Sequence, residues 1–124
     1  MILADSSIWI DHLRQHDERL ATLIEQRQVL MHSLILGELA CGSLGKRDWL
    51  LWRWQRMAQL ESVSDSAALT FVERHSLMSK GIGFIDVHLL AATAAKAGTR
   101  LWTRDQRLAG IARKLGLAFS AHDA

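Results

Sequence analysis

The chain opens with Met1-Ile-Leu-Ala-Asp-Ser-Ser-Ile-Trp-Ile-Asp11, and this stretch decides the fold. Its short apolar run, residues 2–4, is typical of a strand that is buried on both faces, as in a parallel sheet. The run ends at Asp5, after which the Ser6-Ser7 pair offers N-cap oxygens to a helix expected over residues 8–13. In open parallel sheets, ligands bind outside the carboxyl ends of the strands. Asp5 is therefore expected either to cap a helix or to take part in chemistry at that edge.

Short apolar runs and helical periodicity alternate along the rest of the chain. Helices are expected over residues 17–26, 34–44, 48–60, 65–79, 85–97 and 108–115, and strands over residues 29–31, 100–103 and 117–119. Residues 62–64 fit a short strand or a connection equally well. Strands that alternate with helices in this way predict an α/β fold with a parallel sheet.

Size and composition predict one globular domain that spans residues 1–124. Hydrophobic residues make up 49% of the chain and charged residues 23%, which are ordinary values for a folded domain. The apolar runs are far shorter than a membrane span, and Met1 leads directly into the first strand without room for a signal peptide. The single cysteine, Cys41, cannot form an internal disulfide and is expected to be a buried, inert thiol. These features together favour a cytoplasmic protein.

Four acidic residues fall at comparable places in this pattern. Asp5 closes the first strand, and Glu38 lies in the opening turns of the helix after the second strand. Asp86 opens an alanine-rich helix, and Asp105 follows the third strand. Each position alone has a simple explanation, because acids near helix N-termini are favoured by about 0.3–1 kcal/mol. Recurrence at four equivalent places instead favours one shared site at one edge of the sheet.

The segments around these acids are Asp5-Ser-Ser-Ile-Trp-Ile, Leu36-Gly-Glu-Leu, Asp86-Val-His-Leu-Leu-Ala-Ala-Thr-Ala and Thr103-Arg-Asp-Gln-Arg-Leu. In this order and spacing they resemble the four acidic motifs of PIN-domain ribonucleases. Within that family the chain is similar to VapC-type toxins of type II toxin–antitoxin pairs. Ser6 stands where family members often carry Thr, which keeps a hydroxyl at that position.

The resemblance implies a three-layer α/β/α sandwich with a short, mainly parallel central sheet, and endonucleolytic cleavage of RNA. It also implies that Asp5, Glu38, Asp86 and Asp105 hold Mg²⁺ or Mn²⁺, and that a VapB-type antitoxin inhibits the enzyme. The chemistry agrees, because ligands that are all oxygen select hard cations. One or two such ions can activate water, neutralise the scissile phosphate and stabilise the leaving oxygen. Asp5 and Asp86 are expected to lie closest to the metal, with Glu38 and Asp105 orienting waters or holding a second ion.

Four further side chains are candidates for supporting roles. Ser7 and Thr103 carry hydroxyls that could orient the acids. Arg104 and Arg107, on either side of Asp105, could reach RNA phosphate, although exposed arginines on helices are more often solvated charge.

Three tryptophans, Trp49, Trp52 and Trp54, lie within six residues. They could stack on RNA bases, but such a cluster more often marks core or an interface. We expect an interface here, since a homodimer and an antitoxin groove both need apolar surface.

Alternative functions match the sequence less well. His12 and His16 have zinc-ligand spacing, but the glutamate of an HExxH motif is missing. A phospho-receiver domain would carry a lysine soon after Thr103, whereas the next one is Lys114. A haloacid-dehalogenase-type phosphatase would carry a second aspartate at Ser7. A housekeeping PIN-type RNA-processing nuclease without an antitoxin, and a non-catalytic RNA- or partner-binding module, stay open.

Overall fold

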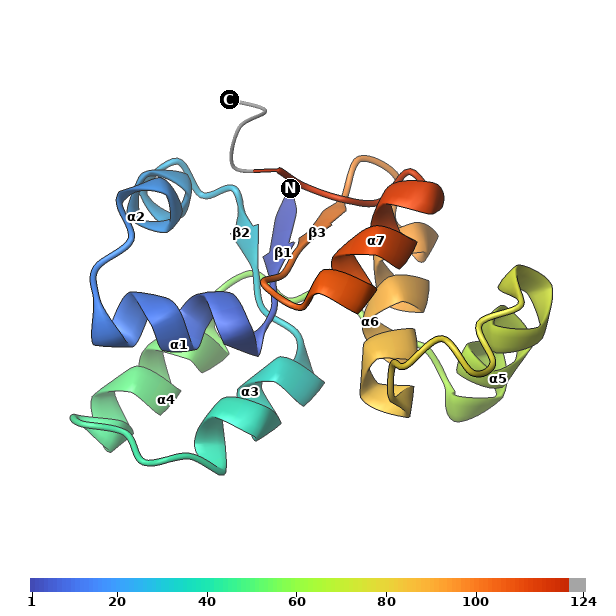
Figure 1. The fold of residues 1–124 in the computed structure, drawn as a ribbon. Helices are drawn as coiled ribbons and strands as arrows, with labels where there is room; N and C mark the ends of the chain where they lie inside the picture. Colours follow the sequence, from blue (N-terminus) through green and yellow to red (C-terminus); the bar gives the residue numbers. More distant parts are fainter. Residues whose placement is uncertain (121–124) are drawn as a thin grey trace.

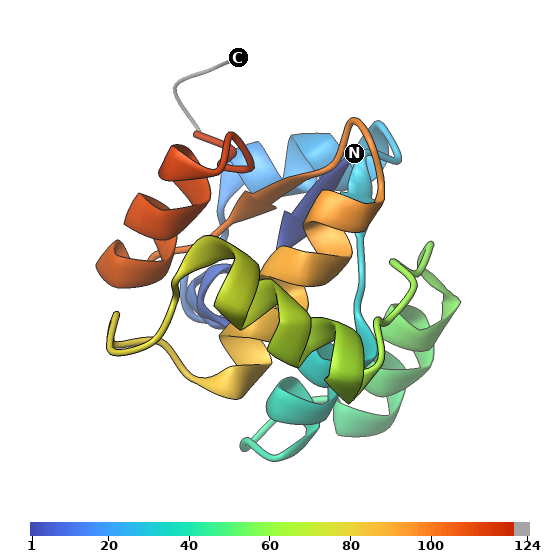
Figure 2. The same ribbon diagram turned by 90° about the vertical axis from the view of Figure 1, so that its right-hand side faces the viewer.

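The computed structural model describes residues 1–120. In chain order its elements are β1 (Ile2–Ala4), α1 (Ser6–Arg14), α2 (Glu18–Glu25), β2 (Val29–Leu30), α3 (Ser33–Ala40), α4 (Arg47–Arg56), α5 (Asp65–His75), α6 (Phe84–Ala95), β3 (Arg100–Trp102) and α7 (Gln106–Lys114). The three strands form a parallel sheet in the order β2-β1-β3. Helices α1 and α2 lie on one side of the sheet, and α6 lies on the other with α5 outside it (Figures 1 and 2). The predicted α/β sandwich is thus confirmed.

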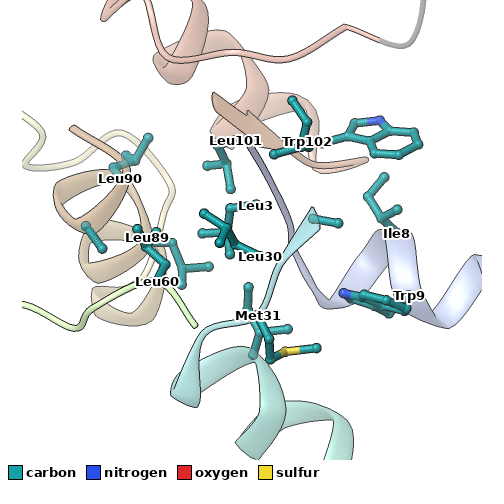
Figure 3. Packing of buried hydrophobic residues seen from close by; sticks show 14 of the residues in the cluster. Leu3, Ile8, Trp9, Leu30, Met31, Leu60, Leu89, Leu90, Leu101 and Trp102 are labelled. Carbon is teal, nitrogen blue, oxygen red and sulfur yellow. The ribbon is translucent and has the colours of Figure 1, made fainter. Parts of the chain in front are cut away.

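The core is built around β1, the central strand. Leu3 pairs in register with Leu30 of β2 and Leu101 of β3, and each of the three is no more than 1% exposed. Burial on both faces explains why these strands have continuous apolar sequences. In Figure 3, residues of α6 and α1 lie on opposite sides of this row: Leu89, Leu90, Ile8 and Trp9.

The carboxyl end of the sheet is where the chain enters its helices. The ladder continues as far as Asp5, whose backbone N–H donates to the carbonyl of Trp102 at 3.0 Å. Helix α1 begins immediately after β1, α3 soon after β2, and α7 soon after β3. Because the strands are parallel, these three helices begin at the same edge (Figure 1).

Three helices end earlier than their apolar periodicity predicts. Helix α3 stops at Ala40, where the guanidinium of Arg47 donates to the carbonyls of Ala40 and Gly42. Helix α5 stops at His75, since Ser76 adopts a left-handed conformation with φ 53°. Both ends depend on a single residue beyond the helix.

Helix α4 ends at Arg56, and the chain beyond it becomes extended. Gln59 forms a parallel bridge with Met31, and its side-chain amide donates to the carbonyls of Trp54 and Met57. Leu60 is buried from this extended segment, so its apolar character reflects the core and not a helix face. Residues 62–64 are a connection, and the expected strand 117–119 is reduced to one bridge between Ala118 and Leu101.

Two expectations about exposure are wrong. Cys41 is exposed, because α3 ends just before it. Trp54 is buried in the core, whereas Trp49 and Trp52 are 55% and 51% exposed and remain available for an interface. None of the helices within residues 1–120 has the length and apolar character that a membrane span requires.

Candidate active site

Asp5 caps a helix with one carboxylate oxygen, and its other oxygen makes no hydrogen bond within residues 1–120. It is only 7% exposed, and its Oδ1 accepts hydrogen bonds from the backbone N–H and the hydroxyl of Ser7. Asp5 itself is therefore the N-cap of α1, and the expectation that Ser6 or Ser7 would cap this helix is wrong. The reason is that α1 begins at Ser6, so both serines are already helical. Within residues 1–120, Oδ2 of Asp5 makes no hydrogen bond and is left for a ligand.

Asp105 and Asp86 also lie at helix starts. Asp105 caps α7, with Oδ1 accepting from the N–H groups of Arg107 and Leu108 at 2.9 and 3.0 Å. Asp86 lies in the first turn of α6, where its Oδ2 accepts from the N–H of Gly83 at 3.4 Å. As in Asp5, one carboxylate oxygen serves the helix, and the other makes no hydrogen bond within residues 1–120.

Glu38 approaches from the second turn of α3. Its Oε1 accepts from the hydroxyl of Ser6 at 3.4 Å, so the side chain reaches the start of α1. The sequence predicted only that position 6 keeps a hydroxyl. In the structure this hydroxyl donates a hydrogen bond to Glu38.

The four acids interact electrostatically. Burial, followed by the charges of Asp86 and Asp5, raises the pKa of Glu38, while the Ser6 hydrogen bond works in the opposite direction. Burial also raises the pKa of Asp86; the Gly83 N–H opposes this, and the charges of Asp105 and Asp5 add to it. Carboxylates raise one another's pKa only at short range. Acids from four distant segments therefore share one electrostatic environment.

The donor set suits a hard divalent cation, since every candidate ligand is a carboxylate oxygen. As the side chains stand, however, no group of three or more His, Cys, Asp or Glu residues within residues 1–120 is ready to hold a metal ion. Ionised carboxylates repel one another, and a divalent cation bound among them would offset that repulsion. Each of the four still has one oxygen free of protein hydrogen bonds within that range, so we expect a bound ion to draw them together.

Ser7 and Thr103 occupy the supporting positions that the sequence suggests. Ser7 connects Asp5 to the turn before α7, because its hydroxyl donates to Asp5 and accepts from the backbone N–H of Arg104. Thr103 holds the other side of that turn, with its hydroxyl accepting from the N–H of Asp105 at 3.0 Å.

The two arginines differ in their surroundings. Arg107 packs over the loop that leads into α6: a Cβ atom added to Gly81 would lie 2.7 Å from its side chain. Its guanidinium forms no ion pair within residues 1–120, so it can still reach a phosphate. Arg104 is instead paired with two carboxylates, those of Asp11 and Asp17.

Sequence reasoning missed one further support of the site. His88 is buried in α6, and its Nε2 lies 2.9 Å from Oδ1 of Asp65 at the start of α5. This pair ties α5 to the helix that carries Asp86. The partners are 23 residues apart, and no spacing pattern indicated the contact.

A groove of about 670 Å³ lies next to the four acids, and Glu38 is the one that lines it. Its apolar lining comes from α1, α3, α4 and the loop between α3 and α4: Ile10, Leu13, Leu39, Leu44, Trp49 and Leu50. Arg14 and Lys46 also line it. A segment that filled this groove would therefore lie directly beside one of the four acids.

Comparisons with known proteins identify the family of this chain. Residues 2–114 match the PIN domain. Over 120 residues, 97% of both chains, the sequence is 39% identical to Ribonuclease VapC32 from two strains of Mycobacterium tuberculosis, CDC 1551 / Oshkosh and ATCC 25618 / H37Rv. The chain belongs to the PIN domain family and, within it, to the VapC-type ribonucleases.

Two solved structures have the same fold. PAE2754 from Pyrobaculum aerophilum matches with a TM-score of 0.65 and 16% identity, over 98% of this chain and 89% of that one. FitAcB from Neisseria gonorrhoeae matches with a TM-score of 0.60 and 20% identity, over the whole of both chains. At these identities the likeness concerns the fold alone.

Proposed function

We propose that this chain is a metal-dependent endoribonuclease and the toxin of a type II toxin–antitoxin pair, acting in the cytoplasm. The observation that carries the proposal is that four acids lie along one edge of the sheet: Asp5 and Asp105 cap α1 and α7, Asp86 lies in the first turn of α6, and Glu38 accepts a hydrogen bond from Ser6 of α1. The name of the Mycobacterium tuberculosis relative, a ribonuclease, supports RNA as the substrate. The bound Mg²⁺, or Mn²⁺, would supply charge neutralisation at the scissile phosphate and an activated water.

The chain's own residues then have distinct tasks. Asp5 and Asp86 are the least exposed of the acids and are proposed as the nearest ligands. Glu38 and Asp105 orient waters from the open side or hold a second ion. Ser7 and Thr103 fix the carboxylate and the backbone to which they are hydrogen bonded. Arg107 is proposed to meet RNA phosphate next to Asp105, because its guanidinium has no acidic partner within residues 1–120.

The direct test is RNA cleavage by the purified protein. We expect fragments from internal cleavage in the presence of Mg²⁺, none in EDTA, and recovery when Mg²⁺ or Mn²⁺ is added back. Binding of RNA without cleavage under any metal condition would favour the non-catalytic module. Cleavage without growth arrest on expression would favour the housekeeping nuclease.

We further propose that the groove beside Glu38 receives the VapB-type antitoxin. An apolar segment lying in it would bury the exposed face of Trp49 and cover Glu38, and would thereby keep RNA away from the carboxylates. Aromatic side chains at the centre of such a groove commonly contribute about 2 kcal/mol or more to binding.

Replacing Trp49 by Ala is therefore expected to weaken binding of the antitoxin about 30-fold, which corresponds to about 2 kcal/mol. Cleavage of RNA by the free toxin should stay unchanged, because no hydrogen bond within residues 1–120 joins Trp49 to the four acids and its ring contact is with Arg53. The measurement is a binding isotherm with the protein encoded next to the toxin gene. Trp52→Ala is the matched control, since Trp52 is equally exposed on the same helix but does not line this groove. Equal affinities for both variants and the wild type would contradict this assignment.

A homodimer is also proposed, and the structure offers a surface for it apart from the groove. Helix α5, the loop after it and the start of α6 expose four large apolar residues: Leu69, Met78, Phe84 and Ile85. A second copy packed here would leave α4 free for the antitoxin, so the two partners need not compete.

A further inference from the structure

Arg104 links three elements through its side chain. Its Nε donates to Oδ2 of Asp11 in α1, and its Nη2 donates to Oδ2 of Asp17, the N-cap of α2; both distances are 3.0 Å. Its guanidinium carbon also lies 5.7 Å from the centre of the ring of Trp102 in β3. The planar fork of an arginine can bridge two carboxylates in this way, whereas a lysine ammonium acts as a point charge.

The backbone of the same residue reaches the candidate active site. The N–H of Arg104 donates to the hydroxyl of Ser7 at 3.0 Å, and that hydroxyl donates to Asp5. The next residue in the chain is Asp105. A single residue thus connects the strand end that carries Asp5 to the turn that carries Asp105.

We propose that Arg104 is a positioning residue, which holds the β3–α7 turn against α1 and α2 and thereby fixes the separation of Asp5 and Asp105. This proposal rests on the proposed function, since the separation matters because a metal ion must fit between the acids. It also replaces the sequence-based expectation that Arg104 contacts RNA. Both ion pairs of Arg104 within residues 1–120 are with carboxylates of this chain, so a phosphate would have to displace one of them to bind its guanidinium.

The two carboxylate oxygens of Asp17 have different partners, which makes the proposal specific. The side chain of Asp17 caps α2 through Oδ1 and binds Arg104 through Oδ2. Burial by itself would raise the pKa of Asp17. Hydrogen bonds from the Leu20 and Arg19 N–H groups, together with the nearby Arg104 guanidinium, outweigh burial and lower that pKa. The carboxylate is thus kept ionised, and the pairing persists at neutral pH.

The first test replaces Arg104 by Ala and by Lys, with folding checked by circular dichroism. Loss of an outer partner of a metal ligand typically weakens metal affinity 10–100-fold. We therefore expect calorimetry to show about tenfold weaker Mg²⁺ binding in Arg104→Ala, with a lower kcat and an unchanged KM for RNA. Arg104→Lys should recover little, because it restores the charge but not the bridge. Arg113→Ala is the control, since Arg113 is an exposed arginine in the last turn of α7 and forms no ion pair within residues 1–120.

The second test uses Asp17→Asn, which keeps a capping oxygen for α2 but releases part of the guanidinium. Positioning by Arg104 predicts weaker Mg²⁺ binding in this variant, and a smaller loss from adding Arg104→Ala than the same change causes in the wild type, because only the bridge to Asp11 is then left to remove. A direct RNA contact predicts the opposite: a lower KM once the arginine is freed. Wild-type Mg²⁺ affinity in Arg104→Ala, or full rescue by lysine, would overturn the proposal while leaving the nuclease assignment intact. Failure of the wild-type protein to bind Mg²⁺ would overturn both.

Discussion

Replacing Asp86 by Asn is expected to lower the rate of RNA cleavage about a thousandfold and to abolish growth arrest on expression. A carboxylate next to a catalytic ion contributes several kcal/mol to the transition state, and about 4 kcal/mol corresponds to a factor of about a thousand. Asp86 is the suitable position because it is half-buried and interacts with Asp105 and Asp5. The amide can still accept the weak hydrogen bond from the Gly83 N–H, so the helix start should persist.

The measurement is the single-turnover rate on one RNA with purified proteins. Asp48→Asn is the matched control, because Asp48 is an exposed acid in the first turn of α4 and belongs to no metal-site candidate. Asp5→Ala should be equally inactive, but it also removes the cap of α1 and is expected to cost about 1 kcal/mol of stability. If Asp86→Asn cleaved RNA at the wild-type rate, the site assignment would be wrong.

The second large effect concerns stability without metal. Burial and neighbouring charges raise the pKa values of Glu38 and Asp86 above their ordinary values of 4.5 and 3.8. The folded state therefore binds more protons than the unfolded state at these two sites. Their contribution to stability is fully present below the ordinary values and is lost as pH rises through the raised values. Asp86→Asn should accordingly melt a few degrees higher than the wild type in EDTA at pH 8, since about 1 kcal/mol moves the midpoint by roughly 4 °C.

Two histidines change the pH dependence of stability in the opposite direction, and their effect must be distinguished from that of the acids. Burial lowers the pKa values of His12 and His32, with a further contribution from neighbouring histidines, so their contribution to stability is fully present above pH 6.5 and is lost as pH falls through the lowered values. The difference between the wild type and Asp86→Asn cancels this effect, because both proteins carry the same histidines. The difference in melting temperature should grow from pH 4 to pH 8.

Mg²⁺ should reverse the loss of stability that the ionised acids cause in the wild type. An ion at about 100 times its Kd stabilises the folded form by about 2.7 kcal/mol, and Asp86→Asn should gain much less at the same concentration. Thermal unfolding at several pH values, with EDTA or Mg²⁺, measures both effects. A variant that melts below the wild type in EDTA at pH 8 would show that the four acids are not clustered.

The strands β1, β2 and β3 and the helix starts could be predicted to within two residues because they depend on local sequence, whereas the expected strand 117–119 is only a bridge. Residues 2–4 are continuously apolar, and the acids at the ends of β1 and β3 coincide with the caps of α1 and α7. Helix ends could not be predicted in the same way. Helix α3 ends where Arg47 folds back on it, and α4 ends because Gln59 pairs with Met31.

The candidate site, too, could be predicted only where it depends on local sequence. Its four acids are visible in the sequence because each lies near a strand end or a helix start, and Ser7 and Thr103 because they lie two residues from Asp5 and Asp105. The side-chain contacts of Arg104 link residues that are 87 and 93 positions apart, so no local pattern could reveal them. Only the folded chain shows that this arginine is paired with two carboxylates.

The most direct measurement of the central claim is Mg²⁺ binding by calorimetry to the wild type and to Asp5→Asn, Glu38→Gln, Asp86→Asn and Asp105→Asn. If these acids form one metal site, the wild type binds Mg²⁺ saturably and each amide variant binds at least about tenfold more weakly. Asp48→Asn should bind as the wild type does. Unchanged Mg²⁺ affinity in all four amide variants, or no saturable binding to the wild type, would contradict the account.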